Sequence, residues 1–156
     1  MSEFALALLV ALTGWWFSTG VILWLVHRNE RHHRRIFALA TATMLLAYYG
    51  VGTSVHQSSP QSVVLAFCLA LLLWGWLEMG YLMGFVTGPR KEACPLGAST
   101  ASRMRLGLRT CLWHELTLLL MVAVLAWLSW QQPNQTALWT FTVLWLMRWS
   151  SKLNLV

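Results

Sequence analysis

Five long apolar stretches, separated by short polar connections, set the pattern of this chain. They cover residues 4–26, 36–55, 63–86, 106–130 and 137–153. Each is close to the roughly 20 residues that a helix needs to cross a hydrocarbon core. The connections between them are too short to fold as separate domains. The pattern therefore predicts an all-α, polytopic membrane protein, with residues 1–156 forming one bundle of about five transmembrane helices.

The Lys and Arg residues are confined to alternate connections, and this predicts the orientation. Basic residues are retained on the cytoplasmic face during insertion, so we expect the N-terminus outside and the C-terminus in the cytoplasm. All eleven lie in three places. The first connection holds Arg28, Arg31, Arg34 and Arg35, and the third connection, with the start of the fourth stretch, holds Arg90, Lys91, Arg103, Arg105 and Arg109. The end of the fifth stretch holds Arg148 and Lys152.

Composition narrows the class of protein further. The chain is 58% hydrophobic and 10% charged, whereas a soluble domain carries about 25% charged residues. The net charge of +6 sits in short loops and not on a folded basic surface, so we expect contact with lipid headgroups and none with nucleic acid. Six of the eleven tryptophans lie deep in the apolar stretches, where a ring can pack between helices, face lipid or line a pigment or quinone surface: Trp15, Trp16, Trp74, Trp76, Trp113 and Trp145.

Small residues at four-residue spacing predict close contacts between helices. Gly80, Gly84 and Gly88 would lie along one face of the third helix, and Gly14 and Ser18 form a shorter version in the first. Such faces let helix backbones approach each other without intervening side chains. They indicate packing within the bundle or against a second copy.

Ionisable residues within the apolar stretches give the strongest chemical signal. Glu78, His114, Glu115 and Arg148 lie at similar depth in three different stretches. A lone charge in the bilayer core costs at least ~2.5–3.5 kcal/mol, so such residues face the bundle and pair. We expect Arg148 to be the counter-ion of Glu78 or Glu115, in an ion pair that holds three helices in register.

Functional alternatives for this intramembrane cluster are a metal site, a proton relay or a set of pigment ligands. Two carboxylates and one histidine fall short of the two Glu-x-x-His pairs of a di-iron bundle. We therefore assign no metal site and no catalytic residue.

His56 is a weaker candidate for ligand binding. It ends the second stretch, and Gly52 precedes it by four residues. A small residue one turn before a histidine leaves space for a flat macrocycle bound through the imidazole. A surface histidine at a helix end is the simpler interpretation.

Several motifs, in order along the chain, resemble the photosynthetic complex assembly protein 2 (PuhE-like) family. They are WWFSTG at 15–20, WGWLEM at 74–79, GFVTGPR at 84–90, WHE at 113–115, and PNQ at 133–135 leading to KLN at 152–154. The resemblance implies an inner-membrane protein of anoxygenic phototrophic purple bacteria. It also implies reaction-centre and light-harvesting subunits as partners, and bacteriochlorophyll or carotenoid as contacting pigments. Family members continue beyond KLN, so the resemblance covers their N-terminal half.

Two classes of function follow. The first is a protein that binds the photosynthetic core as an assembly factor or accessory subunit, and this is the one we expect. The second is a metal-dependent membrane oxidase or hydroxylase that acts on pigment or lipid. A transporter is third, because five helices do not divide into two equal inverted repeats.

Overall fold

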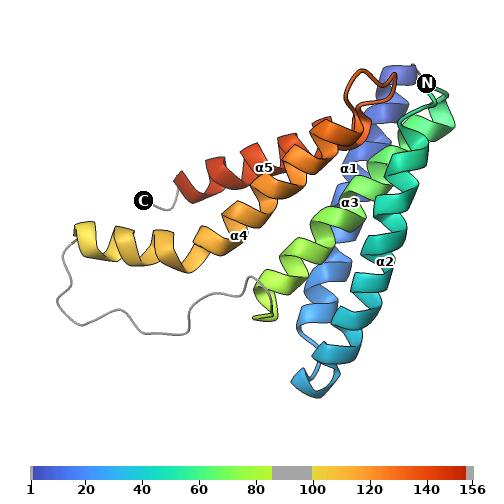
Figure 1. Ribbon diagram of the computed structural model, residues 1–156. Helices are drawn as coiled ribbons and strands as arrows, with labels where there is room; N and C mark the ends of the chain where they lie inside the picture. The colour runs from blue at the N-terminus through green and yellow to red at the C-terminus, as the bar shows by residue number, and fades with distance from the viewer. Residues whose placement is uncertain (1, 86–99, 154–156) are drawn as a thin grey trace.

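A computed structural model describes residues 2–85 and 100–153, and its regular secondary structure over those ranges is entirely helical (Figure 1). The prediction of an all-helical fold is confirmed. The elements are α1 (Glu3–Val26), the short 3-10 helix η1 (Glu30–His32), α2 (His33–Ser54), α3 (Pro60–Leu82), α4 (Thr100–Leu128) and α5 (Thr136–Leu153).

Four of the five α-helices contain a segment long and apolar enough to cross a membrane. These segments are Phe4–Val26, Glu30–Ser54, Pro60–Leu82 and Cys111–Leu128. Within the described part of the chain, α5 is not among them; its polar residues include Arg148 and Ser151. The structure thus supports four spans from length and composition, one fewer than the sequence pattern predicts.

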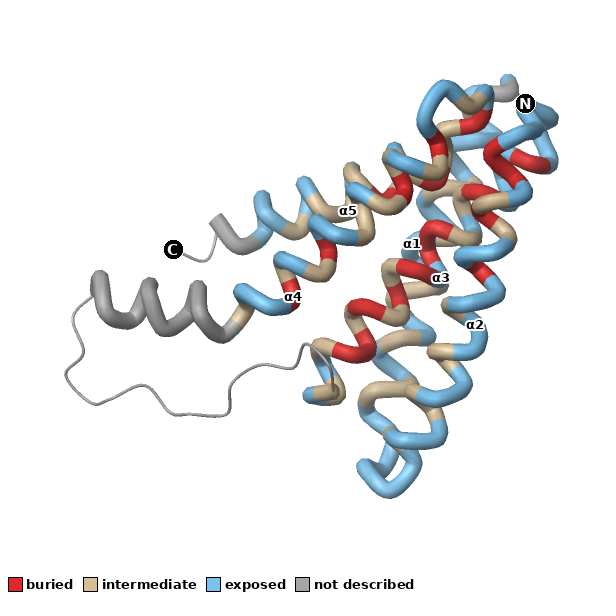
Figure 2. Tube along the Cα trace, in the orientation of Figure 1, coloured by how far each residue is buried: buried red, intermediate tan, exposed pale blue. Residues whose placement is uncertain are grey.

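The helices run up and down, with α3 at the centre. α3 packs against α1, α2, α4 and α5, and most extensively against α2. Figure 1 shows the N-terminus, the α2–α3 connection and the α4–α5 connection at one end, and η1 at the other. Buried positions follow α3 and the sides of α2, α4 and α5 that face it, whereas no described residue of α1 is buried (Figure 2). α1 is therefore a peripheral helix.

Large apolar side chains from α3, α4 and α5 form the core. Leu73, Leu118, Leu125 and Phe141 are completely buried. The ring of Trp74 meets that of Phe141 edge-on, with 5.2 Å between centroids. Three of the six deep tryptophans are half-buried against this core: Trp74, Trp76 and Trp145. The other three are exposed: Trp15, Trp16 and Trp113.

A buried asparagine joins the two connections at the N-terminal end. Asn134 lies between α4 and α5, and its backbone N–H donates to the carbonyl of Val55 at 3.2 Å. Its side-chain nitrogen donates to the Ser54 carbonyl at 3.1 Å and to the Ser62 hydroxyl at 3.2 Å. The side-chain oxygen accepts from the backbone N–H of Thr136 at 3.1 Å, and so caps α5. This network fixes the α4–α5 hairpin to the start of α3.

The third helix ends earlier than the sequence pattern predicts, and this corrects the proposed glycine stripe. Its last residue is Leu82, and Gly84 has φ +75°, in the left-handed region. Phe85 N–H donates to the Gly80 carbonyl at 2.9 Å and Gly84 N–H to the Tyr81 carbonyl at 3.2 Å, which is the Schellman arrangement of a helix end. Among the described residues, no atom lies within 4 Å of the position a Gly84 Cβ would take. Gly84 therefore terminates α3, and no described helix packs against it.

The remaining small residues have different surroundings. A Cβ on Gly80 would lie 3.2 Å from the Phe37 ring of α2, and one on Gly14 would lie 3.0 Å from the Phe67 ring of α3. Ser18 is half-buried and donates to the Trp15 carbonyl of its own helix at 2.9 Å. Gly88 falls outside the described residues.

The closest helix approach at a glycine lies at a position that the spacing argument missed. A Cβ on Gly50 of α2 would lie 2.9 Å from a Leu69 methyl group of α3, whereas nothing lies within 4 Å of a Cβ on Gly52. We expect Gly50→Leu to lower stability by about 1–3 kcal/mol because it overpacks the α2–α3 contact, and Gly52→Leu to have little effect. Denaturation of both variants in detergent, followed by circular dichroism, would measure this. Equal stability of the two variants would contradict the α2–α3 packing.

Candidate functional site

The four ionisable residues of the apolar stretches converge at one place in the bundle. Glu78 comes from α3, His114 and Glu115 from α4, and Arg148 from α5. A terminal guanidinium nitrogen of Arg148, Nη1, donates to both carboxylate oxygens of Glu78, at 2.8 and 2.9 Å. Its Nε lies 3.5 Å from Glu115 Oε1. Arg148 therefore bridges the two carboxylates, and its shorter contacts are with Glu78.

A tryptophan supports the second carboxylate. Trp145 Nε1 donates to Glu115 Oε2 at 3.2 Å. Trp145 precedes Arg148 by three residues, so the two side chains lie on one face of α5 and reach Glu115 together. Each of the two oxygens of Glu115 thus faces an N–H group of α5.

His114 forms the buried side of the cluster. Its side chain is 0% exposed, and its Nε2 lies 3.6 Å from Glu78 Oε1. The imidazole ring lies against Tyr81, with 4.6 Å between ring centroids. Tyr81 completes this side: its hydroxyl lies 3.3 Å from Cys111 Sγ, and its ring lies 5.3 Å from the Arg148 guanidinium carbon.

Sequence reasoning missed three members of the cluster. Each lies three residues from a predicted member: Tyr81 from Glu78, Cys111 from His114, and Trp145 from Arg148. Residues three apart on a helix share a face. Helical spacing from the charged residues could therefore have identified all three.

Burial makes the Glu78–Arg148 pair energetically important. The side chains of Glu78, Glu115 and Arg148 are 13%, 15% and 17% exposed. At such sites the attraction largely offsets the cost of removing the charges from water, so the pair adds little net stability, but removing one partner is costly. Chemically, these contacts connect α3, α4 and α5 through charged side chains. Within residues 2–85 and 100–153, no three His, Cys, Asp or Glu side chains are close enough together to hold a metal ion.

One side of the pair opens onto a groove between α1, α3 and α5. Glu78 and Arg148 line it together with Trp15 and Trp74, and its volume is about 460 Å3. Its other lining residues are mostly apolar: Thr19, Ile22, Leu23, Leu82, Leu144, Met147 and Ser151. The cluster thus has a buried side on α4 and an accessible side toward α1.

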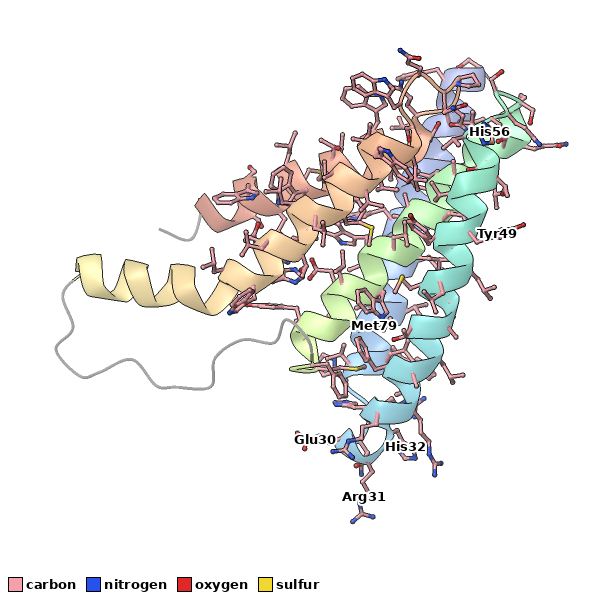
Figure 3. The ribbon with its side chains drawn as sticks, viewed as in Figure 1. Glu30, Arg31, His32, Tyr49, His56 and Met79 are labelled. Carbon is pink, nitrogen blue, oxygen red and sulfur yellow. The ribbon has the colours of Figure 1, made fainter. Side chains whose placement is uncertain are left out.

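His56 lies at the opposite end of the bundle and joins none of these groups (Figure 3). It is exposed, and its Nδ1 lies 2.9 Å from the side-chain oxygen of Gln132. Because that oxygen only accepts hydrogen bonds, Nδ1 carries the proton in this contact. The space beside Gly52 is open.

Comparison with known proteins identifies relatives. The family described as "Protein of unknown function (DUF3623)" matches residues 1–156. The "Uncharacterized 30.4 kDa protein in puhA 5'region" of Rhodobacter capsulatus is 38% identical over 154 residues, which is 94% of this chain and 56% of the relative. The chain therefore spans about half the length of the curated relative that it matches. No solved structure matches it.

Proposed function

This chain belongs to the DUF3623 family, and we propose that it is a PuhE-like photosynthetic membrane protein that binds reaction-centre and light-harvesting subunits. Its role is that of an assembly factor or accessory subunit. The observation that carries the proposal is the relative from the puhA 5' region, because that region belongs to a photosynthesis gene cluster of a purple bacterium. Neighbouring bacterial genes commonly serve one process.

The outer surface of the bundle supports a binding role. α1 exposes large apolar side chains along its length, including Phe4, Trp16 and Phe17 at 78%, 72% and 68%. Helix association in a bilayer relies on van der Waals packing, interhelical hydrogen bonds and lipid entropy. A peripheral helix with such a surface is suited to contact the apolar spans of another membrane protein.

The topology that we propose has five spans, with the N-terminus outside and the C-terminus in the cytoplasm. α5 is included because Arg148, its described charged side chain, turns inward to Glu78 and so avoids lipid. A reporter active only in the cytoplasm should work after Arg35 and at the C-terminus, and should be inactive after Ser59 or Gln132. Activity at Ser59 would reverse the orientation. No activity at the C-terminus, with Gln132 also inactive, would mean that α5 does not cross the membrane.

A pigment contact forms part of the same proposal. The open space beside Gly52 and the imidazole of His56, held through Nδ1, suit a bacteriochlorophyll macrocycle or an adjacent carotenoid. His56→Phe should then reduce the pigment that copurifies with the protein, as measured by absorption after extraction. Unchanged pigment content would remove His56 from the proposal.

Purification of a tagged protein from native photosynthetic membranes tests the proposed function. We expect reaction-centre or antenna subunits to copurify with it, well above the amount recovered with an equally abundant tagged membrane protein of unrelated function. Recovery of the tagged chain with no excess of either kind of subunit would contradict the proposal.

A further inference from the structure

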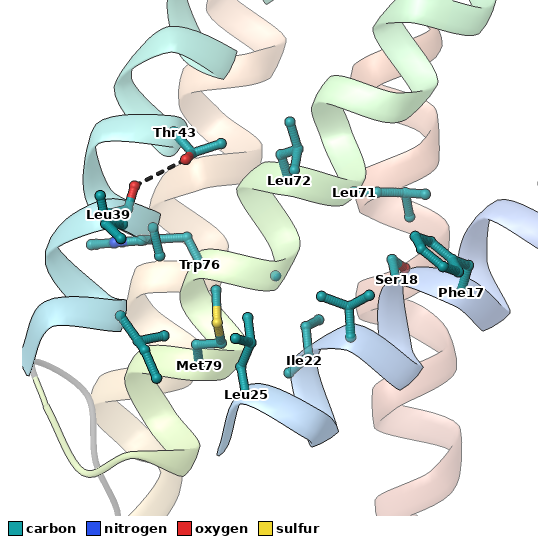
Figure 4. Close-up of a pocket in the computed structure, with 14 residues that line it drawn as sticks. Phe17, Ser18, Ile22, Leu25, Leu39, Thr43, Leu71, Leu72, Trp76 and Met79 are labelled. Carbon is teal, nitrogen blue, oxygen red and sulfur yellow. Dashed lines mark hydrogen bonds between the residues drawn. The ribbon is translucent and has the colours of Figure 1, made fainter. Parts of the chain in front are cut away.

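An apolar slot separates α1 from α2, although the two helices are consecutive in the chain. Each packs against α3, but they make few contacts with each other. The slot lies between residues 17–25 of α1 and 36–43 of α2, and Gly75, Trp76 and Met79 of α3 form its floor (Figure 4). Its volume is about 430 Å3. The contacts of both helices with α3 leave this volume open between them.

Polar groups around the slot already have hydrogen-bond partners in the protein. The hydroxyl of Thr43 donates to the Leu39 carbonyl, and that of Ser18 to the Trp15 carbonyl, both at 2.9 Å. The indole N–H of Trp76 donates to the Thr41 hydroxyl at 2.9 Å. None of these groups needs a polar ligand, so the slot suits a hydrocarbon chain.

Arginines lie close in sequence to the residues at one end of the slot. Leu25, which lines that end, is three residues before Arg28, and Ile36 directly follows Arg34 and Arg35. These arginines are exposed, and Arg28 is held at this end by stacking over the Trp24 ring at 4.0 Å. The side chains of η1 project at the same end (Figure 3). Four arginines lie in this connection against one acidic residue, Glu30.

We propose that the slot binds one acyl chain of an anionic phospholipid whose phosphate lies among these arginines. The slot extends about 12 Å along α1, because residues 17 and 25 are eight helical steps of 1.5 Å apart. A helical segment of this length, about 10–12 Å across, has a volume larger than that of the slot. A single alkyl chain of this length does not. Basic pockets between transmembrane helices are known to hold anionic headgroups. The proposal is independent of the photosynthetic role and of which end of the bundle faces the cytoplasm.

Native mass spectrometry of the detergent-purified full chain tests the acyl-chain part of the proposal. The probes are phosphatidylglycerol and phosphatidylcholine with identical acyl chains. We expect the unmodified protein to retain one phosphatidylglycerol, and Ala40→Phe, which fills the slot, to lose at least about nine-tenths of it. Ala38→Phe is the matched control, because Ala38 is exposed and lies outside the slot; it should bind as the unmodified protein does. Ala40→Leu replaces Ala40→Phe if the larger side chain prevents accumulation.

Arginine substitutions test the headgroup part. Arg28→Gln combined with Arg35→Gln should lower the preference for phosphatidylglycerol over phosphatidylcholine by about tenfold or more. This follows because each basic residue contributes roughly 1 kcal/mol to binding an anionic headgroup. Binding of phosphatidylcholine itself should change little.

Three results would overturn the proposal. Equal retention by Ala38→Phe and Ala40→Phe would place the lipid elsewhere. An unchanged lipid preference in the double arginine variant would remove the headgroup site. Displacement of the phospholipid by a neutral carotenoid in the unmodified protein would assign the slot to a pigment.

Discussion

Arg148→Leu is expected to destabilise the bundle by about 3–5 kcal/mol. The substitution leaves Glu78 without the guanidinium that now donates to both of its oxygens, at a site 13% exposed. It also removes a cationic neighbour of Glu115, the Arg148 Nε at 3.5 Å. The measurement is denaturation of the purified protein in detergent, together with its amount in the membrane. Met147→Leu, an exposed substitution one residue away, should have little effect.

A second substitution should restore much of this loss, and the geometry specifies which one. Glu78→Gln removes the negative charge that Arg148→Leu leaves unpaired, so the double variant should be more stable than Arg148→Leu alone. Glu115→Gln should restore less, because Glu115 lies farther from Arg148 and keeps its hydrogen bond from Trp145. Better rescue by Glu115→Gln would mean that Glu115 is the main counter-ion.

Asn134→Leu is expected to cost on the order of 2–3 kcal/mol, the second-largest effect. Asn134 is 3% exposed, and leucine would leave the Ser54 carbonyl, the Ser62 hydroxyl and the Thr136 N–H each without one buried partner. Each buried group left unsatisfied costs about 1–3 kcal/mol, and the remaining partners limit the total. Ser62 keeps its bond to the Ser54 carbonyl at 3.0 Å.

Detergent denaturation also checks this second prediction. Gln132→Ala, in the same connection, is the control. It removes a bond to His56 that is exposed, where water can replace the lost partner. We expect it to change stability by less than about 0.5 kcal/mol. Equal losses for Asn134→Leu and Gln132→Ala would show that the buried network does not hold the α4–α5 hairpin.

The helices themselves could be predicted because an apolar run of membrane length has few alternatives to a helix in a bilayer. Their ends were harder to place. The end of α3 depends on the conformation of Gly84, and four-residue spacing describes a face only where the helix continues. α5 was predicted as a span from its length, but its polar residues leave it outside the helices that qualify by hydropathy.

The charged residues of the cluster could be predicted from the sequence, but the choice of partner for Arg148 could not. Residues of one depth in neighbouring helices are forced together by the cost of charge in hydrocarbon, which brought Glu78, Glu115 and Arg148 into one group. The choice of Glu78 as the closer partner depends on helix rotation, which the sequence pattern does not specify. The Asn134 network was missed because its partners, Ser54 and Ser62, lie 80 and 72 residues away in the chain.

The central claim is tested most directly by measuring the amount of assembled photosynthetic core in one strain. In that strain the only copy of the gene for this protein carries both Arg148→Leu and Glu78→Gln. We propose that the cluster is structural and that the bundle acts by binding photosynthetic membrane proteins. The double variant should therefore restore both protein level and core absorption relative to Arg148→Leu, approaching the strain with the unmodified gene. Restored protein level with core absorption as low as in a deletion strain would contradict this claim, because the charged groups would then act on a ligand or in chemistry.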